Sequence, residues 1–113
     1  MSQNPNLVRG TLDLLILKSL SWEPKHGYGI GEWIETVTEG KLLMEEGTLY
    51  PALHRLRNKG WVESEWGLSE NNRRANYYRL TAEGRQHLAC EADSWSRYTA
   101  AVARALALET PTP

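Results

Sequence analysis

Two short segments carry the polar and basic side chains that could bind an acidic polymer. In the first, between about residues 46 and 59, Leu49, Leu53 and Leu56 form one apolar helical stripe. At about 100° per residue, the opposite face and its flanks are polar, positive and free of acids. They present five candidate DNA contacts: Thr48, Tyr50, His54, Arg55 and Lys59. A turn further along supplies three more: Asn72, Arg73 and Arg74. Hydrogen-bond donors on a helix that fits the major groove, followed by a basic turn, predict a DNA-binding surface.

The distribution of charge agrees with this surface, although the net charge of −1 favours no class of partner. Residues 48–80 hold six Lys or Arg against three acids, whereas the remaining residues hold seven basic against eleven acidic side chains. A protein that binds nucleic acid with one face shows this polarity. Chance clustering on a solvated surface would also produce it.

These residues need supporting elements, which the apolar periodicity and the breaks between periodic runs predict. The pattern predicts three helices at about residues 11–22, 28–40 and 46–59. A two-stranded hairpin follows at 61–68 and 76–80, and a fourth helix at 81–108. With Thr48 as N-cap, Pro51 falls at the third helical position, where its missing N–H is harmless; an earlier start needs local distortion. Thr81 is predicted to cap the last helix.

This order predicts a mainly α fold with a small β-hairpin: a winged helix-turn-helix followed by a long C-terminal dimerisation helix. We expect residues 1–80 to form the DNA-binding domain, 81–108 the dimerisation helix and 109–113 a disordered tail. Trp61 and Trp66 are expected to pack the wing, as the hairpin is called in this fold, onto the domain. Because residues 1–10 lack the apolar run of a secretory signal, we expect a cytoplasmic protein.

The last helix carries an apolar seam that its own monomer has little room to bury. Spacings of 4, 3, 4, 3 and 4 residues separate Leu88, Ala92, Trp95, Thr99, Val102 and Leu106. The first helix, apolar on two sides, offers Leu12 as a partner surface in a second copy. The sequence therefore predicts a homodimer, in which two recognition helices would meet successive major grooves. Packing of the seam on its own domain is the alternative, possible for the first two turns only.

A set of short motifs between residues 9 and 104 connects the chain to known proteins. They are Gly10 to Leu17, His26 to Gly29, Gly47 to Leu56, Gly60 to Val62, Ser64 to Trp66, Asn71 to Ala75, Tyr77 with Tyr78, and Leu80 to Gly84. In this combination the chain resembles the PadR family of transcriptional regulators, and its single C-terminal helix resembles the compact branch of that family. The resemblance implies a homodimeric bacterial transcription factor, commonly a repressor, that releases its operator when a small molecule or another signal binds.

Trp95 lies at the centre of the seam and would face its symmetry mate near a two-fold axis. The resemblance to compact PadR proteins implies that such a Trp pair can hold a planar aromatic small molecule. The other interpretation is a large interface anchor, the commoner role of an aromatic side chain in this position.

The residue types and their spacing do not indicate a metal site or a catalytic site. The single cysteine, Cys90, and the dispersed His26, His54 and His87 have no metal-ligand spacing, and no set of residues resembles a catalytic site. We therefore expect no enzyme activity, no metal, no cofactor and no membrane span. The competing function is a winged-helix module for protein–protein contact without DNA binding. Such a module does not require the positive, acid-free face.

Overall fold

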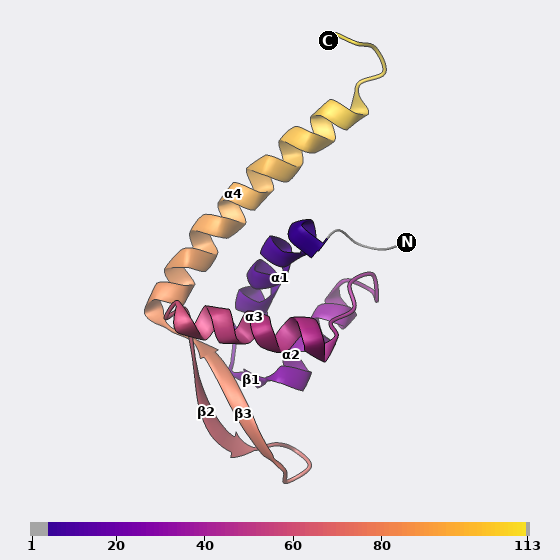
Figure 1. Cartoon of the computed structure of the whole chain (residues 1–113). Coiled ribbons are helices and arrows are strands. Elements are labelled where there is room, and N and C mark those ends of the chain that lie inside the picture. The colour runs from indigo at the N-terminus through magenta and orange to yellow at the C-terminus, as the bar shows by residue number, and fades with distance from the viewer. Residues whose placement is uncertain (1–4, 113) are drawn as a thin grey trace.

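The computed structural model of the protein describes residues 5–112, with side chains from residue 10 onward. Its helices and strands follow in the order α1 (Pro5–Ser19), β1 (Lys25–His26), α2 (Gly27–Val37), α3 (Glu46–Asn58), β2 (Val62–Leu68), β3 (Arg74–Leu80) and α4 (Ala82–Ala107). Three helices form a body, the β2–β3 hairpin projects from it as a wing, and α4 leaves it in the opposite direction (Figure 1). The predicted fold class is confirmed.

The core lies where the apolar stripes of the first three helices meet. Leu12, Ile16 and Leu20 of the α1 segment pack with Ile30 and Ile34 of α2, and all five are nearly inaccessible to solvent. The stripe on α3 closes this cluster, and Val62, Tyr78 and Leu80 from the base of the wing complete it. Burial of these periodic side chains holds the three helices together, because a single short helix is marginal in water.

The sheet has a third strand that the sequence pattern did not predict. β1 pairs antiparallel with β3, with Lys25 opposite Tyr78 and His26 opposite Tyr77, so the strand order is β1–β3–β2. Two residues are too short to show periodicity, and their pairing partners lie about fifty positions away. His26 also caps α2, because its Nδ1 accepts a hydrogen bond of 3.0 Å from the N–H of Gly29.

The start of α3 differs from the prediction. Glu45, not Thr48, is the N-cap residue, and its carbonyl accepts from the N–H groups of both Thr48 (3.0 Å) and Leu49 (2.9 Å). Pro51 therefore lies inside the helix, where it cannot donate to the carbonyl of Gly47. Gly47 is exposed, so water can satisfy that carbonyl.

The N-terminus of α4 is anchored to the base of the wing. Thr81 caps the helix as predicted: its Oγ1 accepts from the N–H of Gly84 (3.0 Å) and donates to the carbonyl of Gly60 (2.6 Å). The N–H of Thr81 donates to the carbonyl of Trp61 at 3.1 Å. The indole of Trp61 stacks on His87 of α4, with ring centroids 3.6 Å apart and planes 16° from parallel. Residues 59–61, 81, 84 and 87 form what we call the α4 junction.

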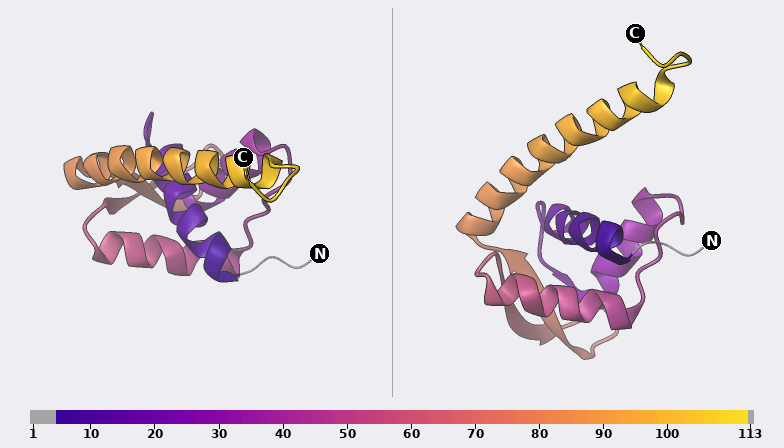
Figure 2. Two further views of the ribbon diagram at one scale, coloured as in Figure 1. Left: turned by 90° about the horizontal axis from the view of Figure 1, so that it is seen from above. Right: turned by 45° about the horizontal axis from the view of Figure 1, so that its top comes forward.

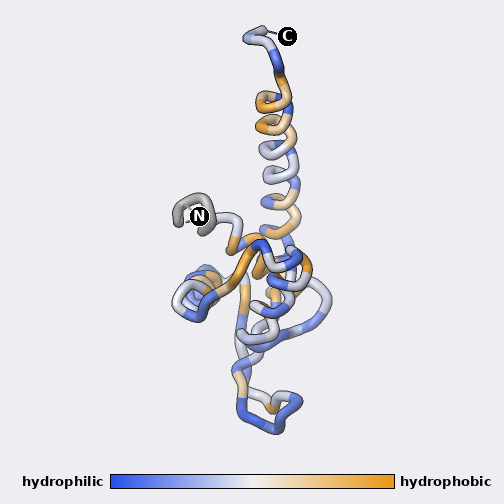
Figure 3. The backbone as a smooth tube through the Cα atoms, turned by 90° about the vertical axis from the view of Figure 1, so that its right-hand side faces the viewer, coloured by the Kyte–Doolittle hydropathy of each residue, from blue (hydrophilic) through white to orange (hydrophobic). Residues whose placement is uncertain are grey.

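Beyond this junction α4 first passes beside α1, and its outer turns then extend away from the domain (Figures 1 and 2). Orange segments on its outer turns mark apolar residues without cover from the rest of the chain (Figure 3). Tyr98 is 59% exposed and Leu106 80% exposed. Residues 109–112 follow without regular secondary structure, and Pro113 lies outside the described residues.

Gly84 provides a direct test of the α4 junction. A Cβ at this position would overlap the backbone carbonyl of Trp61, which cannot turn aside as a side chain can. We expect Gly84→Ala to lower the free energy of unfolding by about 1–3 kcal/mol, the usual range for overpacking.

Gly47→Ala is the matched control, because a Cβ there meets no atom within 4 Å. It should leave stability unchanged or raise it by up to about 1 kcal/mol through helix propensity. Denaturant unfolding at one fixed protein concentration measures both variants. Equal stability of Gly84→Ala and the wild type would contradict the proposed packing.

Candidate nucleic-acid interface

The outer face of α3 is exposed as the periodicity predicts. Leu49, Leu53 and Leu56 are buried, whereas Thr48 and His54 on the other side are exposed. Arg57 of α3 joins this face to the wing. Its Nη1 donates to Ser64 Oγ of β2 at 3.2 Å, and its Nη2 lies 3.4 Å from Nδ1 of His54. This hydrogen bond links the outer face of α3 to the wing.

Arg55 does not extend from that face into solvent. Its Nη2 forms an ion pair of 2.8 Å with Oδ1 of Asp13, and the two side chains are only 30% and 22% exposed. Arg55 lies three residues after the buried Ala52, on the flank that α1 covers. Helical phase distinguishes inner from outer faces, but it does not show which flank a neighbouring helix covers. Arg55 thus holds α3 against α1.

Lys59 and Tyr50 lie near the two ends of α3. The ammonium of Lys59 lies 4.8 Å from the centre of the Trp61 indole, in the α4 junction. Tyr50 is 42% exposed, and its ring rests against Gly27, where any Cβ would overlap it. Burial, followed by the nearby Glu46 and Tyr78, raises the pKa of the Tyr50 phenol. The phenol therefore stays protonated and available as a hydrogen-bond donor.

The wing tip presents its basic residues from a tight turn. The N–H of Ser69 donates to the carbonyl of Arg73 at 2.8 Å, and Asn72 takes a left-handed conformation with φ of 60°. Asn is one of the few residues other than Gly that adopts this conformation readily. Asn72, Arg73 and Arg74 are all exposed.

Trp66 corrects an expectation. Trp61 does pack the base of the wing against α4, but Trp66 is 58% exposed and does not enter the core. The guanidinium carbon of Arg74 lies 4.6 Å from the centre of the Trp66 indole, which places a cation over an aromatic face. An aromatic residue in a strand-like run usually packs on the domain. The sequence pattern therefore did not predict that Trp66 lies in solvent under Arg74.

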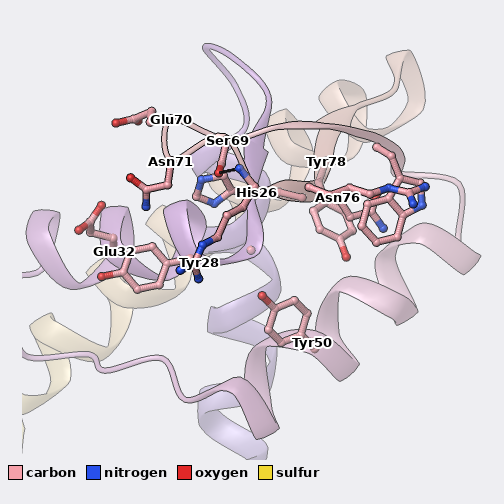
Figure 4. A pocket seen from close by; sticks show the side chains of 14 residues that line it. His26, Tyr28, Glu32, Tyr50, Ser69, Glu70, Asn71, Asn76 and Tyr78 are labelled. Atoms are coloured by element: carbon pink, nitrogen blue, oxygen red, sulfur yellow. Dashed lines mark hydrogen bonds between the residues drawn. The ribbon is translucent and has the colours of Figure 1, made fainter.

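A hollow of about 710 Å³ separates the wing from the starts of α2 and α3 (Figure 4). Tyr28, Tyr50 and Tyr78 line it together with Trp66 and the wing tip. Its charges are balanced, since Arg73 and Arg74 are accompanied by Glu32 and Glu70. The absence of acids predicted for the outer face of α3 therefore does not extend into this hollow.

The residues predicted for an interface between copies fall into two groups. Leu12 is 2% exposed and Leu88 is partly buried, so both pack within their own protomer and Leu12 has almost no surface left for a partner. The other five lie along the outer α4. Thr99 is half-buried there, and four residues are exposed: Ala92, Trp95, Val102 and Leu106. A smaller hollow of about 260 Å³, lined by Leu14, Trp95 and Tyr98 among others, separates α1 from α4.

The described residues contain no group of three or more His, Cys, Asp or Glu side chains that could hold a metal ion. In the same part of the chain, no helix combines the length and the apolar character needed to cross a membrane. Cys90 is exposed on α4.

Comparison with known proteins identifies relatives that match most of the chain. Residues 16–90 match the PadR-like family of transcriptional regulators. A protein of Lysinibacillus sphaericus is 30% identical over 91 residues, which are 80% of this chain and 84% of that protein. A transcriptional regulator from Clostridium thermocellum superimposes with a TM-score of 0.79 at 29% identity, covering 91% of this chain and 97% of its own. A PadR family regulator from Eggerthella lenta superimposes with a TM-score of 0.74 at 32% identity, covering 92% of this chain and 88% of its own.

The match to the family spans most of the winged helix and the start of α4, and the structural neighbours extend it over the rest of the fold. With three helices, a wing and a projecting C-terminal helix, the chain belongs to the PadR-like family of transcriptional regulators.

Proposed function

We propose that the protein is a sequence-specific DNA-binding transcriptional regulator that acts in the cytoplasm. The observation that carries this proposal is the position of the exposed face of α3 beside the basic wing, to which the Arg57–Ser64 hydrogen bond links it. A helix of 13 residues is about 20 Å long and fits a major groove, in which Thr48, Tyr50 and His54 would face base edges and phosphates. Asn72 and Arg73 would reach the neighbouring phosphate backbone.

The structure changes the roles assigned to two basic residues. Arg55 is tied to Asp13, so we assign it to positioning α3 instead of reading bases. Lys59 lies at the C-terminal end of the helix beside Trp61, where its ammonium is suited to contact a phosphate at the edge of the interface.

A winged-helix module that only contacts proteins is the alternative. It would need no exposed cations at the wing tip and no exposed polar side chains at Thr48 and His54 of α3. Both features support DNA binding, and membership of a family of transcriptional regulators supports it further.

We also propose a homodimer formed through the outer part of α4. Trp95, Val102 and Leu106 share one face of a 26-residue helix, and Leu106 is 80% exposed in the single chain. Burial of such an apolar seam against a partner surface is favourable, because it removes apolar side chains from water. A second copy covers them symmetrically and supplies the second recognition helix that an operator with two half-sites requires.

Val102→Asp tests the dimer. A carboxylate in the middle of the seam would lose its hydration on association, so we expect dissociation to monomers in sedimentation velocity at micromolar concentration. Arg97→Ala is the matched control, since Arg97 points away from the seam and pairs with Asp93 on its own helix. A wild-type protein that sediments as a monomer, or a Val102→Asp variant that remains a dimer, would contradict this assignment.

We propose that the regulator is a repressor that a signal releases from DNA, and that a planar aromatic molecule binding near Trp95 is such a signal. The hollow beside Trp95 and Tyr98 supports this site. A planar apolar dye should quench tryptophan fluorescence saturably in the wild type and only weakly in Trp95→Phe, which keeps an apolar ring in the seam. Equal quenching in both proteins would restrict Trp95 to the role of an interface anchor.

The DNA interface predicts a salt-dependent affinity that one wing arginine supports. Binding is measured by gel shift with a duplex that the protein has selected from a random-sequence pool, at two salt concentrations. Loss of one contact between a cation and a phosphate should reduce the magnitude of the slope of log K against log salt by about 1, and we expect this for Arg73→Ala. Arg97→Ala removes the same charge far from the wing and should bind like the wild type. Failure to select any sequence, or equal salt slopes for Arg73→Ala and the wild type, would contradict the proposed interface.

A further inference from the structure

The far half of the wing exposes an unusual combination of side chains on its inner face. Side chains alternate along a strand, so Trp66 and Leu68 of β2 share a face with Ser64, which is bound to Arg57 of α3. Leu68 lies opposite Arg74, and Trp66 lies opposite Asn76. Trp66 is 58% exposed and Leu68 67% exposed, so apolar surface is presented to solvent around one arginine.

The charges of the wing are divided between its two faces. On the outer face Arg79 pairs with Glu63 at 2.7 Å and with Glu65 at 3.7 Å, so that one cation partly offsets the charge of two acids. Arg74, on the inner face, has no carboxylate within ion-pair distance among the described residues and lies over Trp66 instead. Stacking leaves the N–H edge of a guanidinium free for hydrogen bonds and reduces the freedom that it would lose on binding.

The DNA minor groove has the complementary chemistry. Its floor carries hydrogen-bond acceptors, and it is only about 6 Å wide, which suits a flat cation better than a bulky one. In A-tracts the groove narrows and its negative potential strengthens, so that arginine is attracted into it. The exposed indole and Leu68 would meet the deoxyribose walls, which are largely apolar. A phosphate contact alone would require no aromatic support.

We propose that Trp66 and Arg74 act together as a reader of minor-groove width, so that this regulator prefers A·T-rich sequence beside the bases that α3 contacts. Trp66 is the positioning residue, and Arg74 enters the groove. The inference rests on the proposed DNA binding and extends it, because it assigns specificity to a part of the wing that otherwise supplies only charge. Arg73, one residue away, is not stacked on Trp66 and contributes attraction that is independent of sequence.

The test replaces adenine by 2,6-diaminopurine in the sequence that flanks the α3-contacted bases of the selected duplex. This base places an amino group on the minor-groove floor and leaves the major-groove edge unchanged. We expect wild-type affinity to fall about fivefold or more, comparable to the loss from one mismatched base pair. Trp66→Ala and Arg74→Ala should bind the normal and substituted duplexes equally.

Two variants separate this reader from general attraction to DNA. Arg74→Lys keeps the charge but loses the flat guanidinium that lies over Trp66, so it should retain the salt dependence of the wild type and lose discrimination between the duplexes. Arg73→Ala should bind both duplexes more weakly and still discriminate. A wild type that binds both duplexes equally would overturn the inference and leave the proposed DNA binding in place. Equal loss of discrimination in Arg73→Ala and Arg74→Ala would have the same consequence. A wild type that binds neither duplex overturns the proposed function as well.

Discussion

The contact between the start of α4 and the backbone of Trp61 is the constraint on which the architecture depends. Thr81 and Gly84 meet the carbonyls of Gly60 and Trp61 directly, and Gly60 follows the end of α3. One short segment therefore sets the position of the recognition helix, the base of the wing and the direction of α4. Because the backbone of Gly84 lies directly against the carbonyl of Trp61, we expect rotation of α4 to be accompanied by movement of the wing or of the end of α3.

A regulator requires such a connection. The proposed dimer seam and the hollow near Trp95 lie on α4, whereas the proposed DNA contacts lie on α3 and the wing. If a ligand changes the angle between two copies of α4, the junction transmits that change to the spacing of the two recognition helices. A change in spacing reduces operator affinity because both half-sites must be contacted at once.

Local signals in the sequence predicted much of this structure, and contacts between distant segments account for the errors. The Thr81 cap, the three buried leucines of α3 and the position of the wing all follow from nearby residues. Pairing of Lys25 and His26 with β3, the ion pair between Arg55 and Asp13, and the exposure of Trp66 depend on which segments meet in space. Neither residue types nor their spacing contain that information, so these features appear only in the folded chain.

We propose that α3 and the wing form one DNA-binding face, which the α4 seam presents twice to an operator. Hydroxyl-radical footprinting of the selected duplex tests this arrangement. We expect two protected blocks related by two-fold symmetry, with centres about 10 base pairs or a multiple of this spacing apart. Both blocks should disappear together with Val102→Asp at concentrations where that variant is monomeric. A single block that persists unchanged in this variant would show that one copy of the chain binds DNA without the seam.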